Sequence, residues 1–264
     1  MLAFLVRMVV GLTIGVPLLA WLFQDRLLFF PQPRETRFAA RPNVEELTIA
    51  AVDGTKLRGW FIKGAGSPAP LVIYFGGNAE EVSWLEGVAD RFSGWSLLLM
   101  NYRGYGASEG KPGEKVLFED ALAIHDYAVR RLDVNSMRIV AMGRSLGSGV
   151  AVHLAASRAL RGVILVSPYD SMVEVAGRHY PFLPVSLILR HRFDSLSRAP
   201  QIDAPMLCLV AMEDRIVPAA HARVLFDAWR GERTWREFAH ADHDSISGEP
   251  EYWIAIADFL RGLR

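Results

Sequence analysis

Short apolar runs of strand length alternate with longer helix-like runs from residue 71 onward, and this alternation limits the possible fold more than any other feature. The runs at 71–75 and 206–210 contain no charged side chain. Strands that are apolar on both faces are buried on both sides, as in a parallel sheet that helices cover. The expected fold class is therefore α/β, with a mostly parallel, doubly wound sheet and helices on both of its faces.

The same pattern gives the expected elements of a domain that spans residues 44–264. We expect eight strands, at 44–52, 57–62, 71–75, 96–101, 138–142, 162–167, 206–210 and 234–238. We expect helices at 80–92, 114–132, 146–158, 221–229 and 251–263. Asp53-Gly54 is a pair typical of hairpin turns, so the first two strands should be antiparallel edge strands. Residues from about 169 to 200 are expected to form a short cap.

The N-terminal residues have the composition of a membrane-spanning segment. No charged residue occurs from 8 to 23, and Arg7 alone interrupts the apolar run before them. A helix of about 23 residues is ~35 Å long, enough to cross a hydrocarbon core of ~30 Å. No small-x-small cleavage site follows, which argues against a signal peptide, while an apolar helix packed on the domain is a further alternative. We expect a single-pass transmembrane anchor at residues 1–24.

A linker is expected between the anchor and the domain, at residues 25–43. The part from 31 to 42 contains three prolines and three arginines and shows no apolar periodicity. Under the positive-inside rule, arginines after the anchor favour a cytoplasmic position for the domain. These arginines are Arg26, Arg34, Arg37 and Arg41.

The charges and the cysteine count exclude several kinds of site. The 29 basic residues balance the 29 acidic ones, and neither sign forms a long block, so no nucleic-acid partner is expected. Cys208 is the single cysteine and cannot form an internal disulfide. Its apolar neighbours predict a small buried side chain. The sequence shows no metal-ligand spacing, phosphate loop or dinucleotide fingerprint, so we expect neither a cofactor nor a metal.

The pattern Gly-x-Ser-x-Gly, which can mark a nucleophilic serine, occurs at 143–147 and again at 106–110. The chemistry needs a strand, a sharp turn and then a helix, with glycines where a side chain would collide with neighbours. Ser145 has this context, because a strand-like run precedes it and a helix-like run follows. Ser108 lacks it, because Lys-Pro-Gly follows the pattern and breaks a helix. Ser145 is therefore the candidate nucleophile, and Ser108 is interpreted as a loop residue.

In a sheet of this kind, the acid and the histidine that serve a serine at a strand-to-helix turn follow it in the order Ser, acid, His, each on a loop after a late strand. Asp214 comes a few residues after the buried run at 206–210, with Glu213 as its rival. A short carboxylate is the commoner choice there, which favours Asp214. His243 and His240 share the loop after the last expected strand. His243 is favoured because it lies nearer the final helix.

These residues resemble the membrane-anchored α/β-hydrolase-domain proteins, the group that includes lysophosphatidylserine lipases and protein depalmitoylases. The likeness is spread along the chain. It rests on Leu27-Leu28-Phe29-Phe30-Pro31, Tyr74-Phe75-Gly76-Gly77-Asn78, the loop at 101–110, the run at 143–147, Tyr180-Pro181-Phe182-Leu183-Pro184-Val185, Glu213-Asp214 with Val217-Pro218, and His243-Asp244.

The resemblance implies an α/β hydrolase fold with a catalytic triad of Ser145, Asp214 and His243. It also implies that the loop at 103–110 is a shared structural element, and that acyl esters or thioesters, some on lipids or lipid-modified proteins, are the substrates. Gly76 is a departure, since the family often has histidine there, and the change puts the rigidity of that loop in question.

The expected activity is that of a serine hydrolase that forms an acyl-enzyme from an ester or thioester. The developing oxyanion should meet the backbone amides of Leu146 and Asn78. A small-molecule or lipid acyl substrate is expected, and the mixture of apolar residues and arginines in the cap suggests an acyl pocket. An acyltransferase or amidase would use the same triad. A non-catalytic binding protein of this fold is the alternative from another class.

Overall fold

An eight-stranded sheet forms the centre of the molecule, with strand order β1-β2-β4-β3-β5-β6-β7-β8. The computed structural model describes residues 1–264 except 2–3, 5–6, 9–10, 34–40 and 264. The strands are β1 Val44–Ala50, β2 Lys56–Ile62, β3 Ala69–Phe75, β4 Ser96–Met100, β5 Val134–Arg144, β6 Gly162–Val166, β7 Met206–Ala211 and β8 Arg233–Phe238. The expected eight-stranded, mostly parallel sheet is confirmed.

Two strand pairs at one edge are antiparallel and all the others are parallel. β1 pairs with β2 from Val44 opposite Ile62 to Ala50 opposite Lys56, and β2 also runs antiparallel to β4. The turn between β1 and β2 contains Gly54 at a φ of 83°, a conformation that favours glycine. The remaining pairs, from β4–β3 to β7–β8, are parallel. The expected hairpin is present at the expected place.

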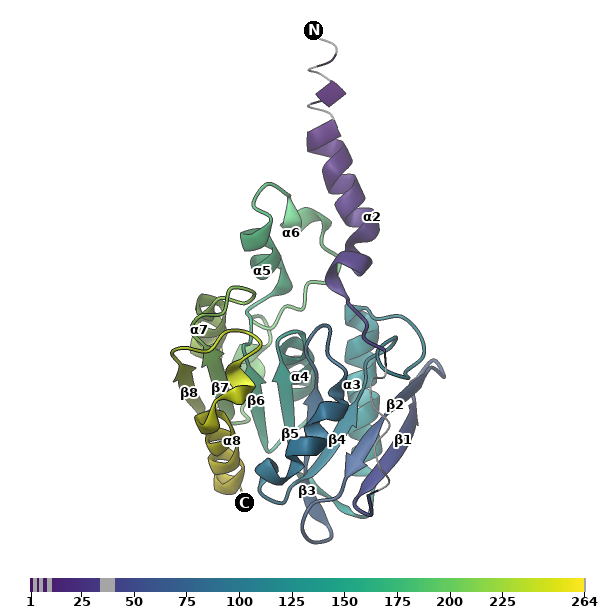
Figure 1. Ribbon diagram of the computed structural model, residues 1–264, viewed down its shortest axis with the longest axis vertical. Helices are drawn as coiled ribbons and strands as arrows, with labels where there is room; N and C mark the ends of the chain where they lie inside the picture. The colour runs from purple at the N-terminus through teal and green to yellow at the C-terminus, as the bar shows by residue number, and fades with distance from the viewer. Residues whose placement is uncertain (2–3, 5–6, 9–10, 34–40, 264) are drawn as a thin grey trace.

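Helices cover both faces of the sheet (Figure 1). Helices α3 (Glu114–Val129), α4 (Leu146–Ser157) and α7 (Ala219–Ala228) pack on one face. The 3₁₀ helix η2 (Val82–Phe92) and helix α8 (Pro250–Gly262) pack on the other. Side chains of β3 serve both layers, because alternate residues of a strand point to opposite faces. Each such buried apolar side chain contributes about 1.5–3 kcal/mol to stability.

Two of the expected helices differ from the structure. The helix expected at 80–92 is a 3₁₀ helix that begins at Val82, and Val88 interrupts it with non-helical angles (φ −123°, ψ 15°). Gly87 and Val88 are both poor helix formers, which accounts for the break. The helix expected at 114–132 ends at Val129, because the chain turns there to begin β5 at Val134.

The expected cap lies at one end of the sheet, above the ends of β5, β6 and β7 (Figure 1). Its helices are α5 (Met172–His179) and the short α6 (Val185–Ile188). Ser171 caps α5, since its side chain accepts a hydrogen bond from the amide of Glu174. Two short 3₁₀ segments, η3 (Ala199–Gln201) and η4 (Ile246–Gly248), complete the loops.

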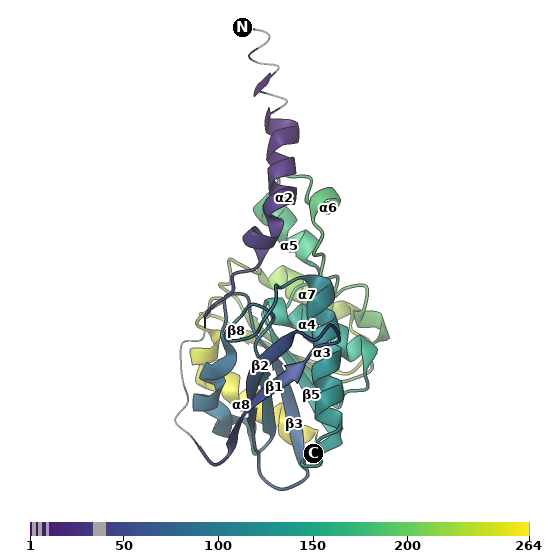
Figure 2. The ribbon, with the colours of Figure 1, turned by 90° about the vertical axis from the view of Figure 1, so that its right-hand side faces the viewer.

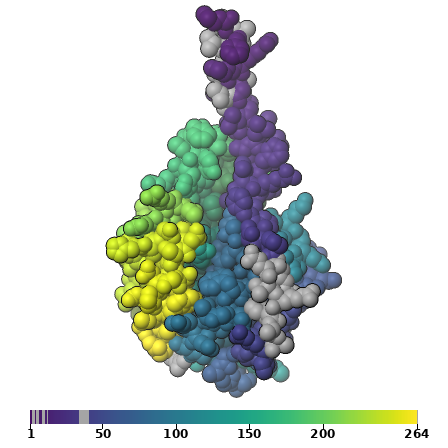
Figure 3. Space-filling view, viewed as in Figure 1, coloured from purple at the N-terminus to yellow at the C-terminus, as the bar shows by residue number. Residues whose placement is uncertain are grey.

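The N-terminal helical segment consists of a π-helical stretch η1 (Gly11–Gly15) and helix α2 (Val16–Leu28). It projects from the same end of the molecule as the cap (Figures 2 and 3). In the part of the chain that the structure describes, no helix has the length and apolar character needed to cross a membrane. The expected transmembrane helix at 1–24 is therefore not found there, and residues 2–3, 5–6 and 9–10 of that prediction lie outside the described residues.

The start of the expected linker differs from the prediction, because α2 continues to Leu28 and the next residues pack on the domain. Phe29 is buried, and its ring meets that of His191 edge to face at a centroid distance of 5.1 Å. The amide of Gly106 donates to the carbonyl of Gln32 at 2.7 Å. Residues 34–40 of the predicted linker lie outside the described residues. The helix is thus joined to the domain by packing and hydrogen bonds at residues 29–32.

Candidate active site

Ser145 occupies the sharp turn between β5 and α4. Its φ is 50° and its ψ −118°, a strained backbone conformation for a residue with a side chain. The flanking glycines permit the turn by close approach. A Cβ on Gly143 would lie 2.2 Å from the carbonyl oxygen of Gly147, and one on Gly147 would lie 2.1 Å from that of Phe75. The strand, turn and helix expected around this serine are therefore present.

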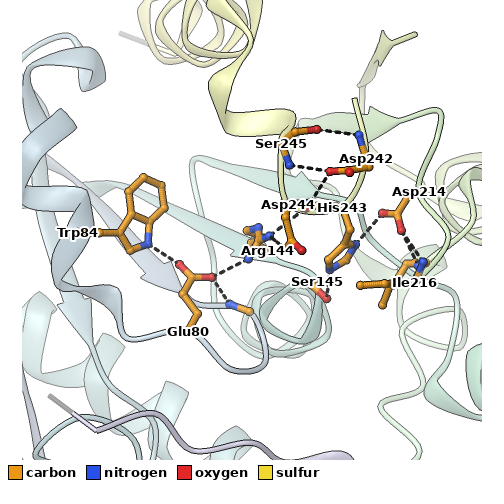
Figure 4. A network of polar contacts seen from close by, with 12 residues as sticks. Glu80, Trp84, Arg144, Ser145, Asp214, Ile216, Asp242, His243, Asp244 and Ser245 are labelled. Carbon is orange, nitrogen blue, oxygen red and sulfur yellow. Dashed lines mark hydrogen bonds and ion pairs between the residues drawn. The ribbon is translucent and has the colours of Figure 1, made fainter. Parts of the chain in front are cut away.

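The structure brings Ser145, His243 and Asp214 together in one chain of hydrogen bonds. His243 Nε2 lies 2.9 Å from Ser145 Oγ. His243 Nδ1 lies 2.6 Å from Asp214 Oδ2. The three residues come from three different loops of the sheet, after β5, after β8 and after β7 respectively, and all are at least 90% buried. Figure 4 shows the serine and the carboxylate on opposite sides of the imidazole.

The second oxygen of Asp214 is held by the backbone. Asp214 Oδ1 accepts hydrogen bonds from the amides of Ile216 at 2.9 Å and Val217 at 2.7 Å. Burial raises the pKa of this carboxyl, but its hydrogen bonds with His243 and the backbone outweigh burial and leave the pKa below its usual value. Asp214 is therefore ionised at neutral pH and fixed in orientation, as a group that orients a histidine must be.

The alternative residues lie elsewhere. The side chains of Glu213 and His240 are 63% and 91% exposed, and His240 Nδ1 lies 3.9 Å from Glu213 Oε1. Ser108 is buried in a loop, where its hydroxyl accepts from the amide of Arg58 at 2.8 Å and donates to the carbonyl of Asn101 at 2.9 Å. Ser108 thus links the loop to β2 and has no histidine among these partners.

A cavity of about 210 Å³ adjoins the serine. Asn78 and Leu146, the residues expected to supply oxyanion amides, line it together with Ser145. The side chain of Asn78 ties its loop to the N-terminal segment. Asn78 Oδ1 accepts from the amide of Phe30 at 3.0 Å, and Asn78 Nδ2 donates to the carbonyl of Leu28 at 2.6 Å. The two expected residues therefore face the same space as the serine.

A polar cluster that the sequence did not predict joins this loop to the loops of the serine and the histidine (Figure 4). Glu80 Oε2 accepts from the amide of Gly77 at 2.6 Å and from Arg144 Nη1 at 3.1 Å. Arg144 also donates to the carbonyl of His243 at 2.8 Å and to Asp244 at 3.0 Å. The sequence did contain a signal, since Arg144 is the single charged residue in the run 139–147.

Glu80 is held from its other side as well. Its Oε1 accepts from Tyr74 Oη at 2.7 Å and from Trp84 Nε1 at 2.9 Å. Burial is the main cause that raises the pKa of Tyr74 well above its usual value, and the negative charge of Glu80 is the next. This phenol therefore remains a hydrogen-bond donor. Tyr102 Oη donates to the carbonyl of Gly76 at 2.9 Å. The loop that lacks the histidine is therefore fixed by Glu80 and Tyr102.

The chain is similar to several known proteins. A family model described as "Serine aminopeptidase, S33" matches residues 66–193. An uncharacterized protein of Mycobacterium tuberculosis is 36% identical to this chain, over 78% of this chain's length and 75% of the relative's length. The α/β hydrolase domain-containing protein WAV2 of Arabidopsis thaliana is 30% identical over 93% of this chain and 90% of its own. The chain belongs to the α/β hydrolase family. An uncharacterized membrane protein of Saccharomyces cerevisiae is 32% identical over 82% of this chain and 79% of its own.

Solved structures confirm the α/β hydrolase fold. An esterase of Pyrococcus furiosus, Pf2001, superposes with a TM-score of 0.71, covering 89% of this chain and 98% of its own at 19% identity. An acetyl xylan esterase from Paenibacillus sp. R4 also gives a TM-score of 0.71, covering 86% of each chain at 18% identity. At these identities the likeness shows the α/β hydrolase fold alone.

Proposed function

We propose that this α/β hydrolase is a serine hydrolase that cleaves carboxylic ester or thioester bonds. The observation that carries the proposal is the continuous hydrogen-bonded chain from Ser145 through His243 to Asp214. A serine becomes a useful nucleophile when an adjacent base takes its proton and a third group holds that base in orientation. No simpler structural role requires these three buried side chains to meet at the end of the sheet.

The proposed reaction has two halves. His243 Nε2 takes the proton of Ser145 Oγ while that oxygen attacks the acyl carbonyl, and the same proton then passes to the departing alkoxide or thiolate. The acyl group is left on Ser145. In the second half His243 removes a proton from water, the hydroxide attacks the acyl-enzyme, and the proton returns to Ser145 as the carboxylic acid leaves. Asp214 holds the proton on His243 Nδ1 throughout.

Two backbone amides are proposed to stabilise the oxyanion that forms in each half-reaction. Leu146 is the first residue of α4, where helix amides point outward without partners in the helix. Asn78 also lines the cavity, in the loop that Glu80 and Tyr102 hold in place. Removal of one such donor typically lowers kcat about 10²- to 10³-fold.

Lipids or acylated molecules are the proposed substrates, because much of the lining of the cavity is apolar. Met172, Val175 and Ala176 of α5 contribute to it, together with Leu27 and Leu28 of α2. Such a lining favours an acyl chain over a sugar or peptide. Water is the proposed acyl acceptor, and transfer to an alcohol or amine would use the same residues.

The proposal is tested with a fluorophosphonate probe, which reacts only with an activated serine. We expect the purified protein to be labelled at Ser145, identified by mass spectrometry of the modified peptide, and to hydrolyse a nitrophenyl butyrate ester. Heat-denatured protein is the control and should not be labelled. A folded protein that neither takes the probe nor cleaves the ester would instead be a binding protein of this fold.

We also propose that the N-terminal segment holds the enzyme at a membrane. Helix α2 exposes large apolar side chains around much of its surface, and the yeast relative is named a membrane protein. The exposed residues include Leu18, Leu19, Leu22 and Phe23. Burial of such side chains in lipid is favourable by about 25 cal/mol per Å². We expect the protein to remain with membranes after an alkaline carbonate wash and to need detergent for release. Recovery in the washed supernatant would refute this.

A further inference from the structure

The cavity at Ser145 is continued by a second cavity of about 160 Å³ between α2 and the cap. Four residues line both cavities, namely Leu27, Leu28, Ala176 and Tyr180. Because these residues line both spaces, the two cavities adjoin, and together, as the channel, they extend from the serine along α2. Figure 3 shows α2 lying against the cap region.

The outer part of this channel is lined almost entirely by aliphatic side chains. The residues that line only the outer cavity come from α2 and from the cap, and all but Gln24 are aliphatic: Ala20, Gln24, Leu183, Val185, Ile188 and Leu189. From Leu28 back to Ala20 the helix covers ~12 Å along its axis. This length gives the channel room for far more than a short acyl group at the serine.

Hydrogen bonds and charges fix α2 in place as a wall of the channel. Gln24 is 5% exposed, and its Oε1 accepts from the amide of Arg190 at 2.7 Å while its Nε2 donates to the carbonyl of Ile188 at 3.1 Å. Asp25 Oδ1 lies 2.9 Å from Arg190 Nη2 and 2.8 Å from His191 Nε2. The polar atoms of Gln24 are thus used between helix and cap, and the other residues that line the outer cavity are apolar apart from Tyr180.

Resting on the proposed hydrolase activity, we propose that the channel binds the acyl chain of a long-chain ester or thioester, with α2 as part of the substrate site. The scissile carbonyl lies at Ser145, and the chain runs between α2 and the cap toward Ala20. Each methylene buried there strengthens binding about fourfold. The N-terminal helix then sets the acyl-chain length, in addition to any role in holding the protein at a membrane.

The test is a series of nitrophenyl esters from acetyl to dodecanoyl, at concentrations below micelle formation. With the wild-type chain we expect kcat/KM to rise with chain length as the channel fills. Ala20→Trp and Leu183→Trp narrow the outer cavity from opposite walls. Each is expected to lower the ratio of kcat/KM for dodecanoyl over acetyl ester by about tenfold or more, which corresponds to the loss of two or more buried methylenes.

Leu22→Trp is the matched control, because Leu22 lies on the same helix, is 53% exposed and lines neither cavity. It should leave the chain-length profile unchanged. A wild-type profile in both channel variants would overturn the proposal, as would a wild-type preference for the acetyl ester.

Binding separates this inference from the proposed reaction. Dodecanoate, titrated calorimetrically into the Ser145→Ala protein, requires no catalysis, and Ala20→Trp in that background should weaken its binding about tenfold or more. If the wild-type protein showed no esterase activity but Ala20→Trp still weakened dodecanoate binding, the reaction would be rejected and the channel retained. Esterase activity with dodecanoate affinity unchanged by Ala20→Trp would reject the channel alone.

Discussion

Ser145→Ala is expected to lower kcat for ester hydrolysis by about 10⁶-fold, to the residual rate that substrate binding and oxyanion stabilisation alone support. His243→Ala should cause a loss of similar size, and the double variant should lose no more than either single one, because the two groups act as one unit. Asp214→Asn is expected to cost about 10⁴-fold, since an amide no longer holds the histidine in the required tautomer. The kcat of each of the four variants is measured by steady-state hydrolysis of a nitrophenyl ester and compared with that of the wild type.

Ser108→Ala is the control, because this serine also stands between two glycines and is also buried. Its hydroxyl joins Arg58 to Asn101, so its loss should lower stability by about 1 kcal/mol and leave kcat within about threefold. If Ser108→Ala removed the activity and Ser145→Ala kept it, Ser108 would be the nucleophile and Ser145 a structural residue. Multiplicative losses in the Ser145 and His243 double variant would contradict the shared mechanism.

Elements of strand length and strong apolar character were predicted well from the sequence alone. Each of the eight strands overlaps its apolar run, although β5 extends beyond the run at 138–142 to Val134 and Arg144, and the hairpin at Asp53-Gly54 is present. Local pattern suffices there because a parallel strand must be apolar on both faces to be buried. The choice of Ser145 over Ser108 rested on the same local information, and the structure places the first in the turn between β5 and α4 and the second in a loop.

Features that depend on contacts between distant segments were missed. The sequence pattern ends the apolar N-terminal run near residue 24, yet α2 continues to Leu28, because Gln24 and Asp25 find partners in the cap more than 160 residues away. The sequence near Gln24 does not predict those partners. Apolar periodicity likewise could not predict the interruption of η2 at Val88, because it indicates on which face a side chain lies and not the backbone φ and ψ angles.

The cluster around Glu80 was missed for the same reason, and its geometry leads to the second large effect. Glu80 lies 64 residues from Arg144 in the sequence, and their side chains are only 7% and 15% exposed. Each carboxylate oxygen of Glu80 accepts two hydrogen bonds, so four donors, from β3, η2, β5 and the loop after β3, depend on it. We infer that Glu80 supports the proposed oxyanion loop in place of the histidine that the resembling family often has at the position of Gly76.

Glu80→Gln is expected to lower the free energy of unfolding by about 3 kcal/mol, near the lower end for a broken buried ion pair, because Arg144 keeps Asp244 and the His243 carbonyl as acceptors. We also expect kcat to fall about 10²-fold with little change in KM, since a loosened Gly77 loop misplaces one oxyanion donor. Denaturant unfolding and steady-state kinetics measure the two effects separately.

Asp244→Asn is the matched control for Glu80→Gln, because Asp244 contacts the same guanidinium but is 81% exposed. Exposed ion pairs contribute about 0–1 kcal/mol, so this variant should unfold almost as the wild type does. The double variant with both Glu80→Gln and Arg144→Gln should lose less unfolding free energy than the sum of the two single losses, since either change alone already breaks the pair. Equal losses from Asp244→Asn and Glu80→Gln would mean that Arg144 alone, whatever its partner, holds the serine and histidine loops together. A fall in stability with kcat unchanged would show that Glu80 supports the fold without positioning the oxyanion loop.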